Sequence, residues 1–387
     1  MLAFRGDFYN IYCPFFATIK NMDTNNTKKH KLTVIVAMVC ILAAIAATVC
    51  ITYKKTSVQK TPVTQAPEPP YTATTFIEES TLTSEGENPQ ETADSYVPLK
   101  NYDNKLSVPT YVTRIDDTWF IVDCYHNRVI YSDSIDKPLD EWYIMSSDAT
   151  RPHTIASDGK VYMIDDTDNH RVLIYEKIDG KFIHTQSFYD IGTRPHYTIY
   201  DETTDTFYVW SSMTGELFCF RTDPSTNRVY LTDKKQIESL NGIYVRSFSI
   251  IDGDIYIVSG VSDKGAEATV LCCDLSTFEV ENTYSVPDEL AGMVQITKIQ
   301  DYYYISTSTD KAGNQDVATI VRTKSLDELS SGNYEDIYST YFLGGGTPYY
   351  MSCVDDTYFL TEHRLTDHSV WSFKVEDNEI TDVEPVF

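Results

Sequence analysis

Two matching segments recur in this chain with a fixed step of 43 residues, and this step constrains the fold more than any other feature. Pro152 and Pro195 each stand inside an Arg-Pro-His motif. Arg128 and Arg171, each opening an apolar run that ends in tyrosine, repeat the same step of 43 residues. Two independent pairs in one register indicate an internal repeat, and a period of this size is typical of proteins built from stacked supersecondary units.

From residue 108 onward the chain consists of short runs of β-branched and aromatic residues. Turns rich in Asp, Asn, Gly and Ser interrupt these runs every 8 to 12 residues or so, which is typical of a sandwich, a barrel or a propeller. Six units of four strands each can be laid out, and each unit takes about 47 residues, a length that suits a propeller blade. The sequence therefore predicts an all-β fold, a six-bladed β-propeller of four-stranded blades over residues 106–387.

A family resemblance rests on the first two units. In the runs 122–129 and 164–172, an Asp closes one strand and an Asn and an Arg open the next. These runs resemble NHL-repeat blades, and Pro152 and Pro195 resemble the proline that introduces such a blade. The resemblance covers about a third of the chain. NHL-like six-bladed propellers include protein-binding scaffolds, lactonase-like hydrolases and a zinc-dependent amidating lyase, so the resemblance implies a fold and leaves the function open.

Residues 32–53 form a run of 22 residues without a charge. As a helix this run would measure roughly 33 Å, which matches the hydrocarbon core of a bilayer. Because more Lys and Arg residues precede it than follow it closely, we expect a transmembrane signal anchor with a cytoplasmic N-terminal segment, residues 1–31. Two alternatives are a cleaved signal peptide, since the run contains small residues, and a lipidated Cys50.

Residues 54–105 are rich in Thr, Pro and Glu and have little apolar periodicity. Such a composition buries too little apolar surface to offset its ordering entropy, so we expect a disordered stalk. The net charge is −26, and residues 61–387 carry 23 Lys and Arg against 55 Asp and Glu. This excess of negative charge excludes nucleic acid as a partner. The expected location is the cell membrane, crossed once, with the N-terminus inside and the propeller outside the cytoplasm.

Five cysteines lie in the predicted propeller, and no pair has the spacing of a zinc site. Because five is odd, at least one thiol stays free or pairs between chains. Several of them sit in apolar runs, where a free buried thiol is the usual outcome.

The first strand of each propeller blade lines the central channel. Alignment of the six first strands on the Pro-His pairs therefore predicts a ring of polar residues at the channel mouth. This predicted site comprises Tyr111, Arg151, His153, Arg194, His196, Arg246, Gln295 and Tyr350.

Three interpretations of this ring compete. In the first, His153 and His196 are satisfied by backbone and water and have no further role. In the second, the ring binds a polar ligand such as a sugar, a carboxylate or the end of a peptide. In the third, the two histidines hold a divalent metal that activates water. That interpretation needs a third ligand, and Arg246, Gln295 and Tyr350 are poor ones, so no cofactor is predicted and a metal remains an alternative.

The sequence thus predicts a membrane-anchored, extracytoplasmic propeller that binds a ligand at the cell surface. The expected partners are an extracellular protein, peptide or carbohydrate. The alternative is a hydrolase or lyase, lactonase-like or metal-dependent, that uses the same channel mouth. Whether the chain is an enzyme stays open on sequence alone.

Overall fold

The computed structural model of the chain describes residues 97–260, 265–365 and 367–387. These residues form 24 strands arranged as six antiparallel sheets of four strands each. Every sheet consists of four strands that are consecutive in the chain. The prediction of an all-β, six-bladed propeller of four-stranded blades is therefore confirmed.

Blades 1 to 3 carry the repeat. Blade 1 consists of β1 (Pro109–Ile115), β2 (Thr118–Asp123), β3 (Arg128–Ser132) and β4 (Tyr143–Ser146). Blade 2 consists of β5 (Ile155–Ser157), β6 (Val161–Asp166), β7 (Arg171–Ile178) and β8 (Lys181–Phe188). Blade 3 consists of β9 (Pro195–Asp201), β10 (Thr206–Ser211), β11 (Glu216–Thr222) and β12 (Val229–Gln236).

Blades 4 to 6 complete the fold. Blade 4 consists of β13 (Val245–Ile251), β14 (Asp254–Ser259), β15 (Thr269–Asp274) and β16 (Val280–Ser285). Blade 5 consists of β17 (Met293–Ile299), β18 (Tyr302–Thr307), β19 (Thr319–Thr323) and β20 (Glu335–Asp336). Blade 6 consists of β21 (Thr347–Val354), β22 (Thr357–His363), β23 (Val370–Glu376) and β24 (Glu379–Pro385).

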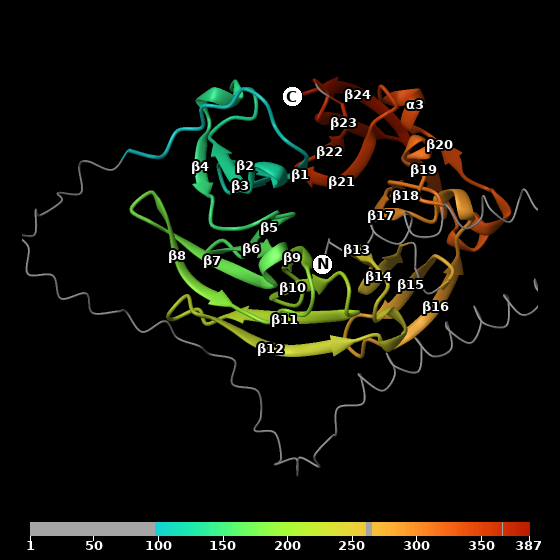
Figure 1. Cartoon of the computed structure of the whole chain (residues 1–387), viewed down its shortest axis with the longest axis horizontal. Helices are drawn as coiled ribbons and strands as arrows, with labels where there is room; N and C mark the ends of the chain where they lie inside the picture. The colour runs from blue at the N-terminus through green and yellow to red at the C-terminus, as the bar shows by residue number, and fades with distance from the viewer. Residues whose placement is uncertain (1–96, 261–264, 366) are drawn as a thin grey trace, which may run out of the picture. The chain divides into compact units, whose positions relative to one another are not determined.

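The blades form a closed ring in which the first strand of each blade lies near the centre and the fourth at the rim (Figure 1). Each first strand contacts the first strand of the next blade, and β21 contacts β1. The burial pattern follows this order. The second strand of blade 3, β10, is buried along its whole length, whereas the rim strand β16 is almost entirely exposed. Inner strands therefore consist mainly of apolar residues, and rim strands contain more polar ones.

Ring closure needs no strand exchanged between the two ends of the propeller. At the seam between blades 6 and 1, Thr361 Oγ1 donates a hydrogen bond to Thr110 O (2.9 Å). The C-terminal Phe387 packs edge-on against the buried ring of Trp142, with 5.9 Å between ring centroids. The last residue of the chain thus helps to join the last blade to the first.

We expect Phe387→Ala to lower the free energy of unfolding by about 1.5 kcal/mol, because it removes a half-buried aromatic contact across the seam. Chemical denaturation of the full chain measures this loss. The exposed Tyr230 on β12 offers a matched control, and Tyr230→Ala should change stability by less than about 0.5 kcal/mol. Equal losses in the two variants would contradict a role for Phe387 in closure.

Residues 97–105, which the sequence analysis assigned to the end of the stalk, lie along the rim of blade 1. The backbone N–H of Ile144 donates to Leu99 O (2.7 Å), and that of Asn101 donates to Trp142 O (2.8 Å). Asn101 is fully buried. Residues 97–105 are therefore hydrogen-bonded to blade 1.

Among the described residues, no helix is long and apolar enough to cross a membrane. The predicted span, residues 32–53, and the predicted stalk up to residue 96 lie outside the described part of the chain. The membrane anchor therefore stays a prediction.

Two elements interrupt the pattern of apolar strands. Residues 334–341 form only the two-residue strand β20 and the short helix α3 (Tyr338–Tyr341). The Asp336 carboxylate accepts a hydrogen bond from the Tyr338 N–H (3.1 Å), which ends the strand and starts the helix. The second is β12, a rim strand whose residues are mostly polar and exposed.

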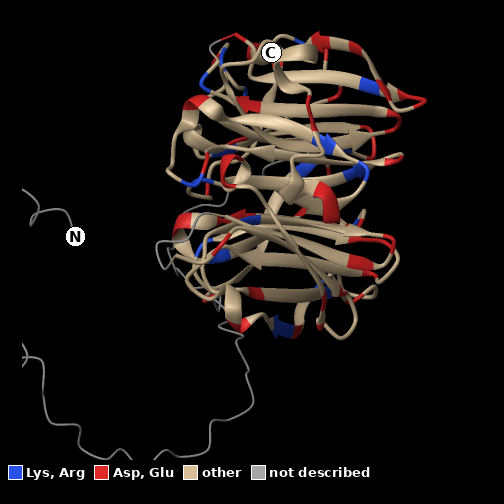
Figure 2. Ribbon diagram, turned by 90° about the vertical axis from the view of Figure 1, so that its right-hand side faces the viewer, with Lys and Arg blue, Asp and Glu red and all other residues tan. Residues whose placement is uncertain are grey.

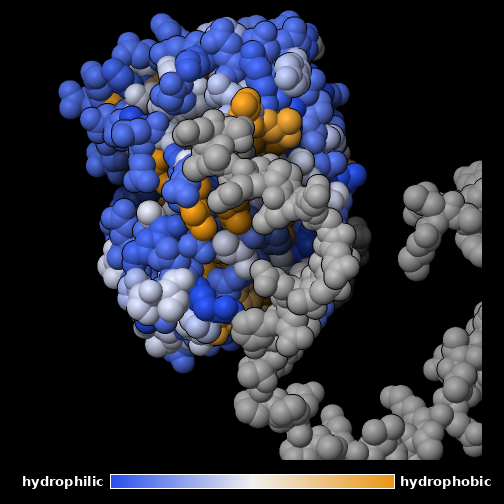
Figure 3. Space-filling view, turned by 90° about the vertical axis from the view of Figure 1, so that its left-hand side faces the viewer, coloured by the Kyte–Doolittle hydropathy of each residue, from blue (hydrophilic) through white to orange (hydrophobic). Residues whose placement is uncertain are grey.

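Acidic residues are spread over the loops and outer strands, as Figure 2 shows. The face drawn in Figure 3 is mostly hydrophilic, and apolar residues gather there in small groups. All five cysteines in the described residues are free; Cys353 is exposed and the other four are buried.

Candidate functional site at the channel mouth

The 43-residue repeat corresponds to a repeated set of contacts around a buried carboxylate. Asp123, at the end of β2, accepts hydrogen bonds from the Ser107 N–H (2.7 Å) and from Arg128 Nε (2.9 Å). The same contacts recur 43 residues further along the chain, among Thr150, Asp166 and Arg171. The Asp and Arg of the repeat therefore fix the loop that leads into the first strand of their own blade.

The arginines of the two Arg-Pro-His motifs sit on left-handed backbone. Arg151 has φ 52° and Arg194 has φ 62°, which is uncommon for residues other than glycine. The N–H of Arg151 donates to Asn127 Oδ1 (2.9 Å), and the N–H of Arg194 donates to His170 Nδ1 (3.0 Å). Asn127 and His170 are again 43 residues apart. Unfavourable backbone of this kind is held in place by its surroundings and gathers at functional sites.

A cavity of about 520 Å³ opens at the end of the channel where these loops lie. All six blades contribute to its lining, so it lies on the propeller axis. Among the described residues that line it there is no Asp or Glu. Its basic lining residues are Arg151, His153, Arg194, Arg246, His363 and Arg364.

Two of the arginines share one carboxylate. Arg151 Nε lies 3.4 Å from Asp168 and Arg194 Nη1 lies 3.9 Å from the same residue. The second distance exceeds that of a hydrogen bond. Arg194 Nε is buried and has no hydrogen-bond partner among the described residues. Arg194 therefore keeps most of its donors unused.

Arg364 has a carboxylate partner and Arg246 has none among the described residues. Arg364 forms an ion pair with Asp316 (3.1 Å). Arg246 forms no ion pair with any described carboxylate, and its Nη1 donates to the backbone oxygen of Met293 (3.1 Å). A guanidinium group has five N–H donors, so Arg246 also has donors to spare.

Tyr244 lies beneath Arg246 and Arg194. The guanidinium carbon of Arg246 is 4.6 Å from the centroid of the Tyr244 ring, and that of Arg194 is 5.9 Å from it. A cation near the face of an aromatic ring is attracted by the ring quadrupole. The two guanidinium groups thus converge on one aromatic ring in the cavity wall.

Below the arginines the two histidines of the motifs stack on each other. The ring centroids of His153 and His196 are 3.7 Å apart, and both side chains are buried. Burial holds the pKa of each well below 6.5. The charge of Arg194 adds to the effect at His153. At His196 a proton would be repelled by one on the stacked His153, and the charges of Arg246 and Arg194 add to the effect. Both imidazoles are therefore neutral at pH 7, and the arginines carry the positive charge of the cavity.

The tautomer of His196 follows from its neighbours. The Tyr350 hydroxyl donates to the backbone oxygen of Arg246 (3.1 Å), so it accepts from His196 Nδ1 at 2.9 Å. His196 Nε2 then accepts from the Tyr244 hydroxyl (2.9 Å). Both ring nitrogens are thus engaged, and His196 positions Tyr244 beneath the arginines.

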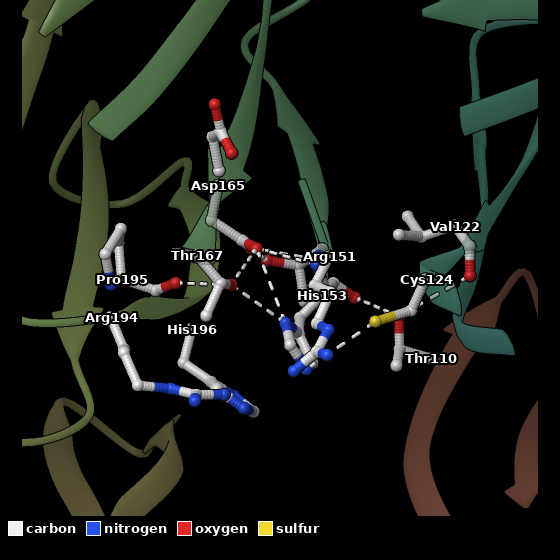
Figure 4. Close-up of polar contacts among 12 residues, drawn as sticks. Thr110, Val122, Cys124, Arg151, His153, Asp165, Thr167, Arg194, Pro195 and His196 are labelled. Carbon is white, nitrogen blue, oxygen red and sulfur yellow. Dashed lines mark hydrogen bonds and ion pairs between the residues drawn. The ribbon is translucent and has the colours of Figure 1, made fainter. Parts of the chain in front are cut away.

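His153 is fixed in a similar way (Figure 4). The Thr167 hydroxyl donates to Pro195 O (2.7 Å) and therefore accepts from His153 Nδ1 (2.9 Å). His153 Nε2 faces Cys124 Sγ at 3.9 Å. The buried Asp165 accepts hydrogen bonds from the backbone N–H groups of His153 (2.6 Å) and Thr154 (2.9 Å). Burial raises the pKa of Asp165 to about 7, against the lowering effect of these bonds.

The histidine pair is not part of any close trio of metal-ligating atoms in the described residues. A single trio of His, Cys, Asp or Glu atoms within 4.8 Å occurs there, formed by Asp254, Cys272 and Glu281 on blade 4. A metal at the pair would also have to displace the hydroxyls that bind His196. The surrounding arginines would repel a cation.

The structure brings most of the predicted site residues together, in two layers. Four of them line the cavity: Arg151, His153, Arg194 and Arg246. His196 and Tyr350 lie beneath the cavity, in the hydrogen-bond network described above.

Tyr111 and Gln295 are predicted site residues that do not line the cavity. The Gln295 amide donates to Tyr197 Oη (3.1 Å) and to Met351 O (3.0 Å) and is buried deeper in the channel. Tyr111 packs against apolar clusters between the blades. Both residues lie further along their strands than the motif histidines, because the alignment has no Pro-His pair to anchor it in blades 1 and 5.

Tyr244, His363 and Arg364 are cavity residues that the sequence analysis missed. Tyr244 precedes β13, two residues before Arg246, as Arg151 and Arg194 precede their histidines. That offset is a signal that could have revealed it. His363 ends the second strand of blade 6 and Arg364 follows it, and no repeat marks these positions.

Searches against family models and curated proteins find no match for this chain. Among solved structures, the chain resembles a candidate 6-phosphogluconolactonase from Bacteroides uniformis ATCC 8492. The TM-score is 0.51 at 12% identity over 72% of this chain and 84% of the other. A candidate 6-phosphogluconolactonase from Bacteroides fragilis NCTC 9343 gives 0.51 at 13% identity, over 72% and 83%. At such low identity these likenesses show the propeller fold alone, and the NHL pattern remains a resemblance.

Proposed function

We propose that this protein is a binding module that holds a small anionic ligand in the axial cavity. The observation that carries the proposal is the lining of that cavity. Four arginines and no described carboxylate face a hollow of about 520 Å³ in a chain whose net charge is −26. Concentrated positive charge in a strongly acidic protein favours an anionic ligand.

The chemistry of the lining suits such a ligand. Hydrogen bonds from guanidinium groups to oxyanions are about twice as strong as neutral ones, and the forked donors of arginine bind two oxygens at once. Arginine stays charged at any physiological pH. Tyr125 and Tyr349, also in the lining, offer aromatic faces to the remainder of the ligand, such as a sugar ring.

We expect the purified full chain to bind glycerol phosphate saturably and to bind neutral glycerol at least tenfold more weakly. Isothermal titration calorimetry at low salt measures both, and added NaCl should weaken the first, because charge attraction supplies much of the affinity. Arg194→Gln should reduce affinity about tenfold. Equal affinities for glycerol phosphate and for glycerol would contradict the proposal.

We also propose that the propeller acts outside the cytoplasm, anchored by residues 32–53, where its partner is an extracellular protein, peptide or carbohydrate. An acidic surface and an apolar run followed by a Thr/Pro-rich segment support this placement. Treatment of intact cells with a protease tests it. Loss of the propeller from intact cells is the expected result, and full protection until the cells are lysed would contradict it.

A second candidate function is that of a hydrolase acting on an anionic cyclic ester. The position of His153 in the cavity wall favours it, because histidine is the side chain that most often serves as a general base. The names of the two similar structures point to the same class of reaction. Hydrolysis of a phosphorylated sugar lactone, lost in His153→Gln, would support this candidate. Release of acid at the uncatalysed rate would exclude it.

A further inference from the structure

We propose that the charged group of the ligand is a compact dianion, bound between Arg194 and Arg246 above Tyr244. This inference rests on the proposed function and adds the charge and the size of the group that is recognised. A phosphate monoester above about pH 6 has this character.

The first argument is the charge balance of the cavity. Four guanidinium groups line it, and two carboxylates, Asp168 and Asp316, form ion pairs with three of them. Two positive charges are left without a counterion among the described residues. The neutral histidines add none. A ligand group with two negative charges restores neutrality, and a singly charged group leaves one arginine uncompensated.

The second argument is the position of the two positive charges that have no counterion among the described residues. Arg246 has no carboxylate partner in the described chain, and Arg194 has only the 3.9 Å contact with Asp168. Both guanidinium groups lie within 6 Å of the centroid of one ring, that of Tyr244. Two like charges held this close favour a single ligand group that contacts both. Two separated carboxylates would not fill this position.

The third argument is that the position is built by other residues. His196 and Tyr350 fix Tyr244 through a chain of hydrogen bonds, and the left-handed backbone at Arg194 is held by His170. Arg194 Nε is buried and unpartnered among the described residues. A buried donor without an acceptor is costly, and an oxyanion at this position would relieve that cost.

The test compares anions of similar shape and different charge at one pH and one ionic strength. Sulfate is the compact dianion, methanesulfonate its singly charged counterpart, and succinate a dianion with separated charges. Calorimetry on the full chain should give at least tenfold tighter binding for sulfate than for either of the others. Arg246→Gln should abolish this preference and weaken sulfate binding at least tenfold.

Arg114→Gln is the matched control. Arg114 forms an ion pair with Asp355 (2.9 Å) at the other end of β1, so the variant loses the same charge away from the cavity. It should bind sulfate like the parent chain, and thermal unfolding should verify that both variants are folded. Equal binding of methanesulfonate and sulfate, or tighter binding of succinate, would overturn the dianion and leave the proposed function standing. If none of these anions and no phosphate ester binds, the proposed function fails as well.

Discussion

Asp123→Ala is expected to lower the free energy of unfolding by about 3 kcal/mol, because it breaks a buried ion pair. The Asp123 carboxylate is fully buried and accepts two hydrogen bonds from Arg128, whose side chain is 8% exposed. Alanine also removes the acceptor of the Ser107 N–H. The loss lies at the lower end of the range for such pairs, because Asp103 still contacts Arg128 at 2.6 Å. Urea denaturation of the full chain measures it.

The repeat supplies a comparison for this variant. Asp166→Ala removes the equivalent carboxylate in blade 2, where the Arg171 side chain is 21% exposed and water can solvate the charge that is left. We therefore expect a smaller loss there. A loss below about 1 kcal/mol for Asp123→Ala, or a larger loss for Asp166→Ala, would contradict the account of how the repeat stabilises the blades.

The second large effect is the dependence of folding stability on pH. His153 and His196 are buried around the channel mouth and His363 is half-buried there. Removal from water holds the pKa of His363 at about 3 and those of the other two well below 6.5. Below pH 6.5 these histidines take up protons in the unfolded chain and stay neutral in the folded one. Acidification from pH 7.5 to 5 therefore destabilises the fold through each of these histidines.

Two buried carboxyls act in the opposite direction. Burial raises the pKa of Asp165 and of Glu362 to about 7 in the folded protein. Between their unfolded values, near 4, and pH 7 the folded protein holds more protons than the unfolded chain. Each carboxyl therefore stabilises the fold as the pH falls from 7.5 to 5, by about 2 kcal/mol. The two sets offset each other, so the parent chain should lose less stability between pH 7.5 and 5 than the three histidines alone would cost it.

Glu362→Gln separates these contributions. The carboxyl accepts hydrogen bonds from the Tyr338 hydroxyl and from Trp371 Nε1 (3.0 Å), and glutamine keeps one acceptor and the same shape. Acidification from pH 7.5 to 5 should cost this variant about 2 kcal/mol more than the parent chain. Denaturation at the two pH values gives the difference, and exposed Glu202→Gln serves as the control. Identical loss of stability on acidification in all three proteins would contradict the raised pKa of Glu362.

The sequence predicts the parts of this molecule that the repeat encodes. The 43-residue step gives the blades and places Arg151, His153, Arg194 and His196 at equivalent positions, and the structure brings all four to the same end of the channel. The stacking of the two histidines follows from that equivalence, because neighbouring blades bring equivalent residues close to the axis.

Other parts depend on contacts between residues far apart in the chain. Tyr350 binds His196 across 154 residues, and no local pattern reveals that contact. His363 and Arg364 reach the cavity from the end of a second strand, a position that alignment of first strands leaves out. The charge balance of the cavity depends on Asp168 and Asp316, whose contacts with Arg194 and Arg364 form only when neighbouring blades pack together.

The central claim is that the axial cavity binds an anion between two particular arginines. A crystal structure of the protein with selenate tests this most directly, because the anomalous signal of selenium locates the anion. The account predicts selenate within hydrogen-bond distance of Arg194 and Arg246, above the ring of Tyr244. A cavity without selenate, in crystals that bind selenate elsewhere, would contradict it.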